Sequence, residues 1–70
     1  MKGFKILINQ KWVDALINRA NVKYVYPVDA TVCTGGGVEV QESVRVEMVD
    51  DESVIVKGSL DGFLNRMDAM

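Results

Sequence analysis

The chain of 70 residues contains no histidine and only one cysteine, Cys33. Without histidine it has no imidazole to act as an acid or base near neutral pH, to activate a nucleophile or to bind a metal ion. A single cysteine cannot form an intramolecular disulfide, and a lone thiol is typical of a reducing cytoplasm. We therefore expect a non-catalytic protein with no metal and no cofactor.

Long apolar segments are absent as well. The first apolar run, Ile6-Leu7-Ile8, has three residues, whereas a secretory signal needs about 7–15 and a membrane span about 20. The sequence thus predicts a cytoplasmic protein without a membrane partner, and its length suffices for one domain over residues 1–70. A domain of this size buries only about 60% of the surface of its unfolded chain. Because 49% of the residues are hydrophobic, we expect a homo-oligomer, most simply a dimer, to cover the remainder.

The charges are distributed unevenly. Residues 1–27 carry five Lys or Arg and one Asp, for a formal charge of +4, and residues 28–70 carry −6. The two halves form a basic and an acidic pole unless folding brings them together and they neutralise each other. The acidic overall balance makes bulk nucleic acid an unfavourable partner.

The first half of the chain predicts a strand, a helix and a second strand. Residues 4–8 read as a strand, and Asn9 is a candidate cap for a helix over 11–20. Apolar residues recur there with the spacing of one helical face: Val13, Leu16, Ile17 and Ala20. Residues 22–28 are rich in β-branched and aromatic side chains and predict a strand, in which the only proline, Pro27, indicates an edge or an end.

The second half predicts a hairpin followed by a helix. Residues 38–48 alternate apolar and polar side chains, as one long strand or as two joined by a bulge. Residues 50–53 form a polar turn, and 54–56 return as a strand that is apolar on both faces. Ser59 is a good N-cap for a C-terminal helix with an apolar stripe at Leu60, Phe63, Leu64 and Met67. The expected fold is α+β, with a mainly antiparallel sheet of about four strands, one helix after the first strand and a C-terminal helix.

Aromatic and basic residues supply the best candidate binding surface. Trp12, Tyr24 and Tyr26 occur with Lys11, Arg19 and Lys23, a combination suited to stacking on bases and contacting phosphates. Tyrosine and tryptophan are equally favoured in protein interfaces. Core or dimer packing, a protein partner, and a nucleotide or nucleic acid all remain open for this patch.

A glycine-rich segment, Thr34-Gly35-Gly36-Gly37, could hold an anion through consecutive backbone N–H groups. The Lys and Ser or Thr of a P-loop do not follow it, so a mobile hairpin loop is the alternative. Cys33 has no nearby group to activate it and is expected to be a strand residue. Three consecutive acidic residues, 50–52, lack the spacing of a calcium loop and are expected to form a solvated turn.

Several segments together resemble the small FlbD-type proteins: residues 8–9, 22–27 and 54–57, with the last running into 59–64. The resemblance implies a compact sheet, a short hairpin, a closing helix and a non-enzymatic role, and many short phage and bacterial accessory proteins share this outline. Residues 30–43 depart from it, because they insert a glycine-rich segment where the family has a tight hairpin.

Two functions follow from these patterns. The first is a non-catalytic, oligomeric interaction protein of the phage or bacterial accessory type, which binds and occludes or modulates a partner protein, as an inhibitor does. The alternative is a protein that sequesters a nucleotide-like anion at a subunit interface. In that case loop N–H groups would meet the phosphates, with Arg19, Lys23 or Arg45 adding charge.

Overall fold

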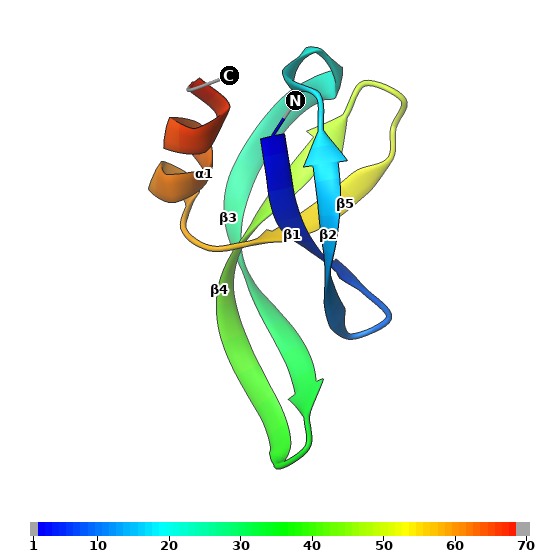
Figure 1. Cartoon of the computed structure of the whole chain (residues 1–70), viewed down its shortest axis with the longest axis vertical. Helices are drawn as coiled ribbons and strands as arrows, with labels where there is room; N and C mark the ends of the chain where they lie inside the picture. Colours follow the sequence, from blue (N-terminus) through cyan, green and yellow to red (C-terminus); the bar gives the residue numbers. More distant parts are fainter. Residues whose placement is uncertain (1, 69–70) are drawn as a thin grey trace.

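A computed structural model of the chain describes residues 2–68, which form one five-stranded sheet, a short 3₁₀-helix and one α-helix (Figure 1). The elements are, in order, β1 (Lys2–Ile8), β2 (Lys11–Ile17), η1 (Arg19–Asn21), β3 (Val22–Thr34), β4 (Gly37–Met48), β5 (Ser53–Lys57) and α1 (Leu60–Asp68). All pairings are antiparallel, and the strand order is β2-β1-β5-β4-β3. The α+β class and the antiparallel sheet are confirmed, but the sheet has five strands where about four were expected.

The helix expected over residues 11–20 is wrong, because β2 occupies most of that segment. Asn9 and Gln10 both adopt positive φ, 51° and 67°, as the two central residues of a type I′ turn do. This turn reverses the chain, and β2 then pairs with β1 along its whole length. Asn9 therefore belongs to a hairpin turn and caps no helix. Val13 and Leu16, expected on a buried helical stripe, are exposed.

β3 and β4 form a long hairpin. A register shift lies between Val22 and Tyr24, and from there the pairing runs unbroken to the last pair, Thr34 with Gly37. Residues 38–48 are thus part of one continuous strand, β4. At the tip, Gly37 has a φ of +134°, a conformation that side chains other than glycine adopt only with strain.

The core lies between α1 and the sheet. Its buried residues are Phe4, Ile6, Ile17, Val44, Val46, Val56, Phe63 and Met67. Ser59 Oγ accepts a hydrogen bond from the Gly62 N–H at 3.0 Å, which confirms the predicted N-cap of α1. Leu64, expected in the same stripe, is 41% exposed and lies at its margin. The described part of the chain has no helix long and apolar enough to cross a membrane.

β5 lies between β1 and β4, an interior position that suits a strand that is apolar on both faces. Its last pair with β4 joins Lys57 to Ser43. Beyond that pair β5 no longer accompanies β4, and we call residues 29–34 and 37–42 the hairpin arm. Figure 1 shows the arm twisting away from α1, and the molecule measures 38 Å along its longest axis.

One face of the arm is covered along β3. Ala30 and Val32 are buried, and their register with β4 places them on the sheet face opposite α1. Gln10, in the β1–β2 turn, accepts a hydrogen bond from the Cys33 N–H at 3.2 Å. The β1–β2 hairpin therefore curls toward β3 of the arm, as a strongly twisted sheet allows.

Candidate functional site

Two tyrosines and an arginine meet on the sheet face opposite α1. Tyr26 is paired with Arg45, and Tyr24 with Glu47, so alternate residues of both strands lie side by side on one face. The two rings stack with centroids 6.0 Å apart and planes inclined by 23°. Tyr24 is 54% exposed and Tyr26 is 37% exposed, so this aromatic pair is available to a partner.

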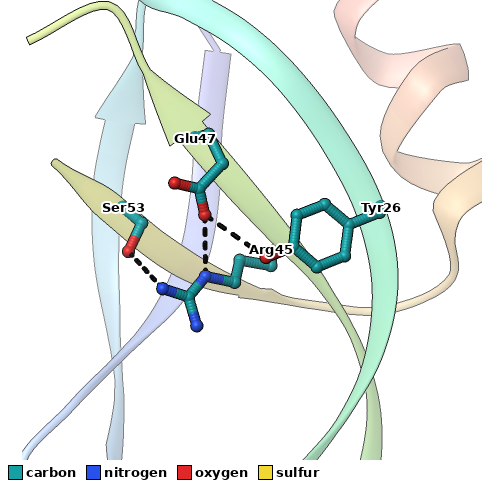
Figure 2. A network of polar contacts seen from close by, with 4 residues as sticks. All are labelled: Tyr26, Arg45, Glu47 and Ser53. Atoms are coloured by element: carbon teal, nitrogen blue, oxygen red, sulfur yellow. Dashed lines mark hydrogen bonds and ion pairs between the residues drawn. The ribbon is translucent and has the colours of Figure 1, made fainter. Parts of the chain in front are cut away.

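A hydrogen-bond network holds the arginine in place (Figure 2). Arg45 donates from Nε to Glu47 at 2.8 Å and from Nη2 to Ser53 Oγ at 3.2 Å. The Tyr26 hydroxyl donates to the same Glu47 oxygen at 3.4 Å. The bond to Glu47 raises the pKa of Arg45 above its ordinary value, and nearby Tyr26 adds to this. Figure 2 shows the remaining guanidinium nitrogen pointing away from these partners.

These residues form a small polar and aromatic surface, which we call the tyrosine–arginine surface. Its members are Tyr24, Tyr26, Arg45, Glu47 and Ser53. Glu47 and Ser53 were not predicted as site residues from the sequence. The alternation of Arg45 with Glu47 on β4 could have indicated Glu47, because the two side chains lie on the same face of the strand. Ser53 could not be found in this way, because its position depends on the pairing of β5 with β4.

The structure does not join Trp12 to this surface. Trp12 is half-buried on β2, at the opposite edge of the sheet from β3, with three strands between them. The Lys57 ammonium group lies 5.8 Å from its ring centroid, within range of a cation–π interaction. The predicted aromatic and basic patch is therefore divided between two edges of the sheet.

Arg19 and Lys23 are exposed and paired with acidic residues. Arg19 lies in η1 with Nη2 3.8 Å from Asp68, and Lys23 Nζ lies 3.7 Å from Asp51. Such exposed pairs contribute about 0–1 kcal/mol to stability. Both join the basic first part of the chain to the acidic second part, so folding partly neutralises the two poles.

The glycine segment lies at the tip of the arm, far from Arg45. The Thr34 hydroxyl accepts from the Gly36 N–H at 3.3 Å and donates to the Gly37 carbonyl at 3.2 Å. Eight residue pairs separate the tip from Arg45, or about 26 Å at the strand rise of 3.3 Å per residue. Gly35, Gly36 and Gly37 therefore cannot hold the same small anion as Arg45 of their own chain.

The remaining candidates are accounted for locally. Cys33 is an exposed strand residue. In the acidic turn, Asp50 accepts from the Glu52 N–H at 3.1 Å, and Asp51 pairs with Lys23. Residues 2–68 contain no cluster of three His, Cys, Asp or Glu side chains that could share a metal ion.

Comparison with known proteins identifies no relative of the chain. No family model matches the sequence, and no curated protein or solved structure is significantly similar to it.

Proposed function

We propose that the chain is a non-catalytic interaction protein that binds and occludes or modulates a partner protein through the tyrosine–arginine surface. The observation that carries this proposal is the stacked, exposed tyrosine pair beside an arginine with a fixed orientation. Tyrosine and arginine are among the residues most enriched at energetic hot spots of protein interfaces. We further propose that the protein is cytoplasmic and self-associates, as small accessory or inhibitory factors of phages and bacteria do.

Preorganisation supports this proposal. Binding costs about 0.5–1.5 kcal/mol for each flexible side chain that becomes immobilised. Glu47 and Ser53 already hold the Arg45 guanidinium, and Glu47 also bonds the Tyr26 hydroxyl. The surface therefore loses less side-chain entropy on binding than a set of unconstrained residues would.

The charge of the surface favours a protein partner over a nucleotide. The carboxylate of Glu47 lies 2.8 Å from Arg45 Nε, so an incoming phosphate would meet a negative charge next to the cation. A protein surface can offer both a donor to the carboxylate and an acceptor to the free guanidinium nitrogen. Sequestration of an anion would need the glycine tip of one copy and the arginine of another, since the two lie too far apart in one chain.

The resemblance of the sequence to the FlbD-type proteins is part of this proposal. That resemblance implies a compact sheet, a short hairpin and a closing helix, and residues 30–43 depart from it.

The proposal is tested by affinity capture from lysate of the natural host with quantitative mass spectrometry. Wild-type protein is compared with Tyr24→Ala/Tyr26→Ala and with Leu16→Ala, a control at an exposed apolar residue on β2. We expect a partner that the wild type and the control retain equally and the double variant loses at least tenfold. Circular dichroism confirms that each variant is folded. Full retention by the folded double variant would contradict the proposal.

A nucleotide panel discriminates the alternative function. A ligand at 100 times its Kd stabilises the folded state by about 2.7 kcal/mol. We expect no nucleotide to raise the melting temperature of the wild-type protein. A reproducible rise that is lost in Arg45→Ala would favour anion sequestration over partner binding.

A further inference from the structure

The hairpin arm contains a stretch of strand edge that lies beyond the end of β5. β4 pairs with β5 only from Ser43 to Glu47, and no strand within residues 2–68 lies on that side of residues 37–41. Figure 1 shows β3 on one side of this part of β4 and no element on the other. A free strand edge is a template for pairing with a further extended chain.

Val38 and Val40 direct their backbone groups to this open side. The Glu42 carbonyl accepts from Gly58 N at 3.0 Å, so even-numbered residues of β4 face the side of β5, because successive residues of a strand alternate in this direction. The same bond fills the edge position at Glu42. The two valines therefore offer two N–H and two C=O groups, whereas the odd-numbered residues of β4 face β3.

The other edge of the arm is protected. By the same alternation, odd-numbered residues of β3 direct their backbone groups away from β4. Pro27 has no N–H to offer there, and the Cys33 N–H is already bonded to Gln10. Proline and covering side chains are common means of blocking an edge strand. Residues 37–41 contain no proline.

The side chains at the open edge are apolar and acidic. Val38 is 69% exposed and Val40 is 66% exposed. Residues 24–44 contain no lysine or arginine and three acidic residues, namely Asp29, Glu39 and Glu42. All three are exposed, and none forms an ion pair within residues 2–68. The arm therefore attracts a cationic chain and repels a second copy of the same segment.

We propose that residues 37–41 bind an extended basic peptide segment of a partner protein, which joins the sheet as an antiparallel strand in line with β5. The peptide residues opposite Val38 and Val40 exchange up to four backbone hydrogen bonds with them. These two residues are apolar, because they share a face with the valines, and the residue between them is Lys or Arg, because it lies opposite Glu39. The paired stretch begins opposite Gln41, since Gly58 occupies the next position.

Binding at this edge is independent of the function proposed above. The two valines lie on the sheet face toward α1, whereas Tyr24, Tyr26 and Arg45 lie on the opposite face. The Tyr24→Ala/Tyr26→Ala variant should therefore bind a basic peptide like the wild type. Failure of the tyrosine–arginine surface and failure of the arm are thus distinguishable.

Binding is tested by NMR titration of the isotope-labelled chain with the peptide Lys-Val-Lys-Val-Lys, blocked at both ends. We expect saturable shift changes centred on residues 37–41 and amide exchange at Val38 and Val40 at least tenfold slower in the complex. The same peptide with both valines N-methylated keeps its charge but lacks the N–H groups that pair, and it should bind at least tenfold more weakly. The acidic peptide Glu-Val-Glu-Val-Glu should not bind. Absence of binding up to millimolar peptide, or equal binding of either control peptide, would overturn the proposal.

A proline substitution tests the same edge from the side of the protein. Val40→Pro removes the outward N–H and leaves the bonds to β3 in place, because Val40 directs no backbone group to β3. It should lose at least tenfold in peptide affinity, whereas the matched control Val40→Thr keeps the N–H and should bind within about threefold of the wild type. Slow amide exchange at Glu39 confirms that the hairpin is intact in each variant. Unchanged affinity of the folded Val40→Pro variant, or protection of Val38 by a second copy in the absence of peptide, would contradict the proposal.

Discussion

The helix-covered body and the hairpin arm share two strands, β3 and β4, but differ in what covers these strands. In the body, Val44 and Val46 of β4 are fully buried beneath α1, whereas in the arm Val38 and Val40 of the same strand are about two-thirds exposed. The four valines follow one alternation and differ only in their neighbours. Burial is therefore decided by what packs on the strand, and a surface available for binding arises where β3 and β4 extend beyond β5.

The largest expected difference between the regions is in stability. Phe63 is buried, with its ring centroid 5.1 Å from that of Phe4. Phe63→Ala should destabilise the protein by about 3–5 kcal/mol through lost burial and a cavity, enough to unfold a domain this small. Val38→Ala in the arm should cost less than about 1 kcal/mol. Urea unfolding at low protein concentration measures the free energy of unfolding of both variants. Equal losses of stability would contradict the distinction between body and arm.

The tip of the arm depends on one of its glycines. Gly37→Ala should destabilise the hairpin by about 1–3 kcal/mol, because its φ of +134° is unfavourable for alanine. Gly35→Ala is the matched control: its added Cβ also meets open space, and its φ is not positive. Urea unfolding of the two variants should separate them clearly. A tolerated Gly37→Ala would contradict the geometry of the turn.

The N-cap of α1 stabilises the helix that covers the core. Ser59→Ala removes the acceptor for the Gly62 N–H and should cost about 1 kcal/mol. Ser59→Asp should restore most of that loss, because aspartate also caps helices well. Thermal unfolding of the three proteins provides the measurement, and unchanged stability in Ser59→Ala would mean that the cap contributes nothing.

The smallest expected effect concerns the protected edge of the arm. Gln10→Ala removes the acceptor for the Cys33 N–H and should change global stability by no more than about 0.5–1.5 kcal/mol. Amide hydrogen exchange at Cys33 should accelerate, while exchange at Val32, which faces β4, stays slow. Unchanged exchange at Cys33 would show that Gln10 does not protect this edge.

Local patterns in the sequence predicted the parts of the fold that local chemistry determines. The cap at Ser59, the polar turn before β5 and the edge position of Pro27 each follow from one residue type in its immediate context. The spacing of Val13 and Leu16 was ambiguous, because it fits a helical face and also occurs in a twisted edge strand. The turn at Asn9 and Gln10 decided between them.

The binding surface could be predicted only in part. Tyr24, Tyr26 and Arg45 were candidates from residue type alone, and the register of β3 with β4 brings them together. That register is a long-range property, as is the end of β5 that leaves the arm unaccompanied. Trp12 and the glycine tip were grouped with the tyrosines by residue type, and sheet order separates them.

Amide hydrogen exchange along β4, measured by NMR at increasing protein concentration, tests the account most directly. Glu39 and Gln41 direct their N–H groups to β3 and should be protected at every concentration. Val38 and Val40 direct their N–H groups to the side where β5 has ended, and both should exchange fast in the dilute protein. Slow exchange at both valines in the dilute protein would contradict the claim that this edge of β4 lies beyond the end of β5.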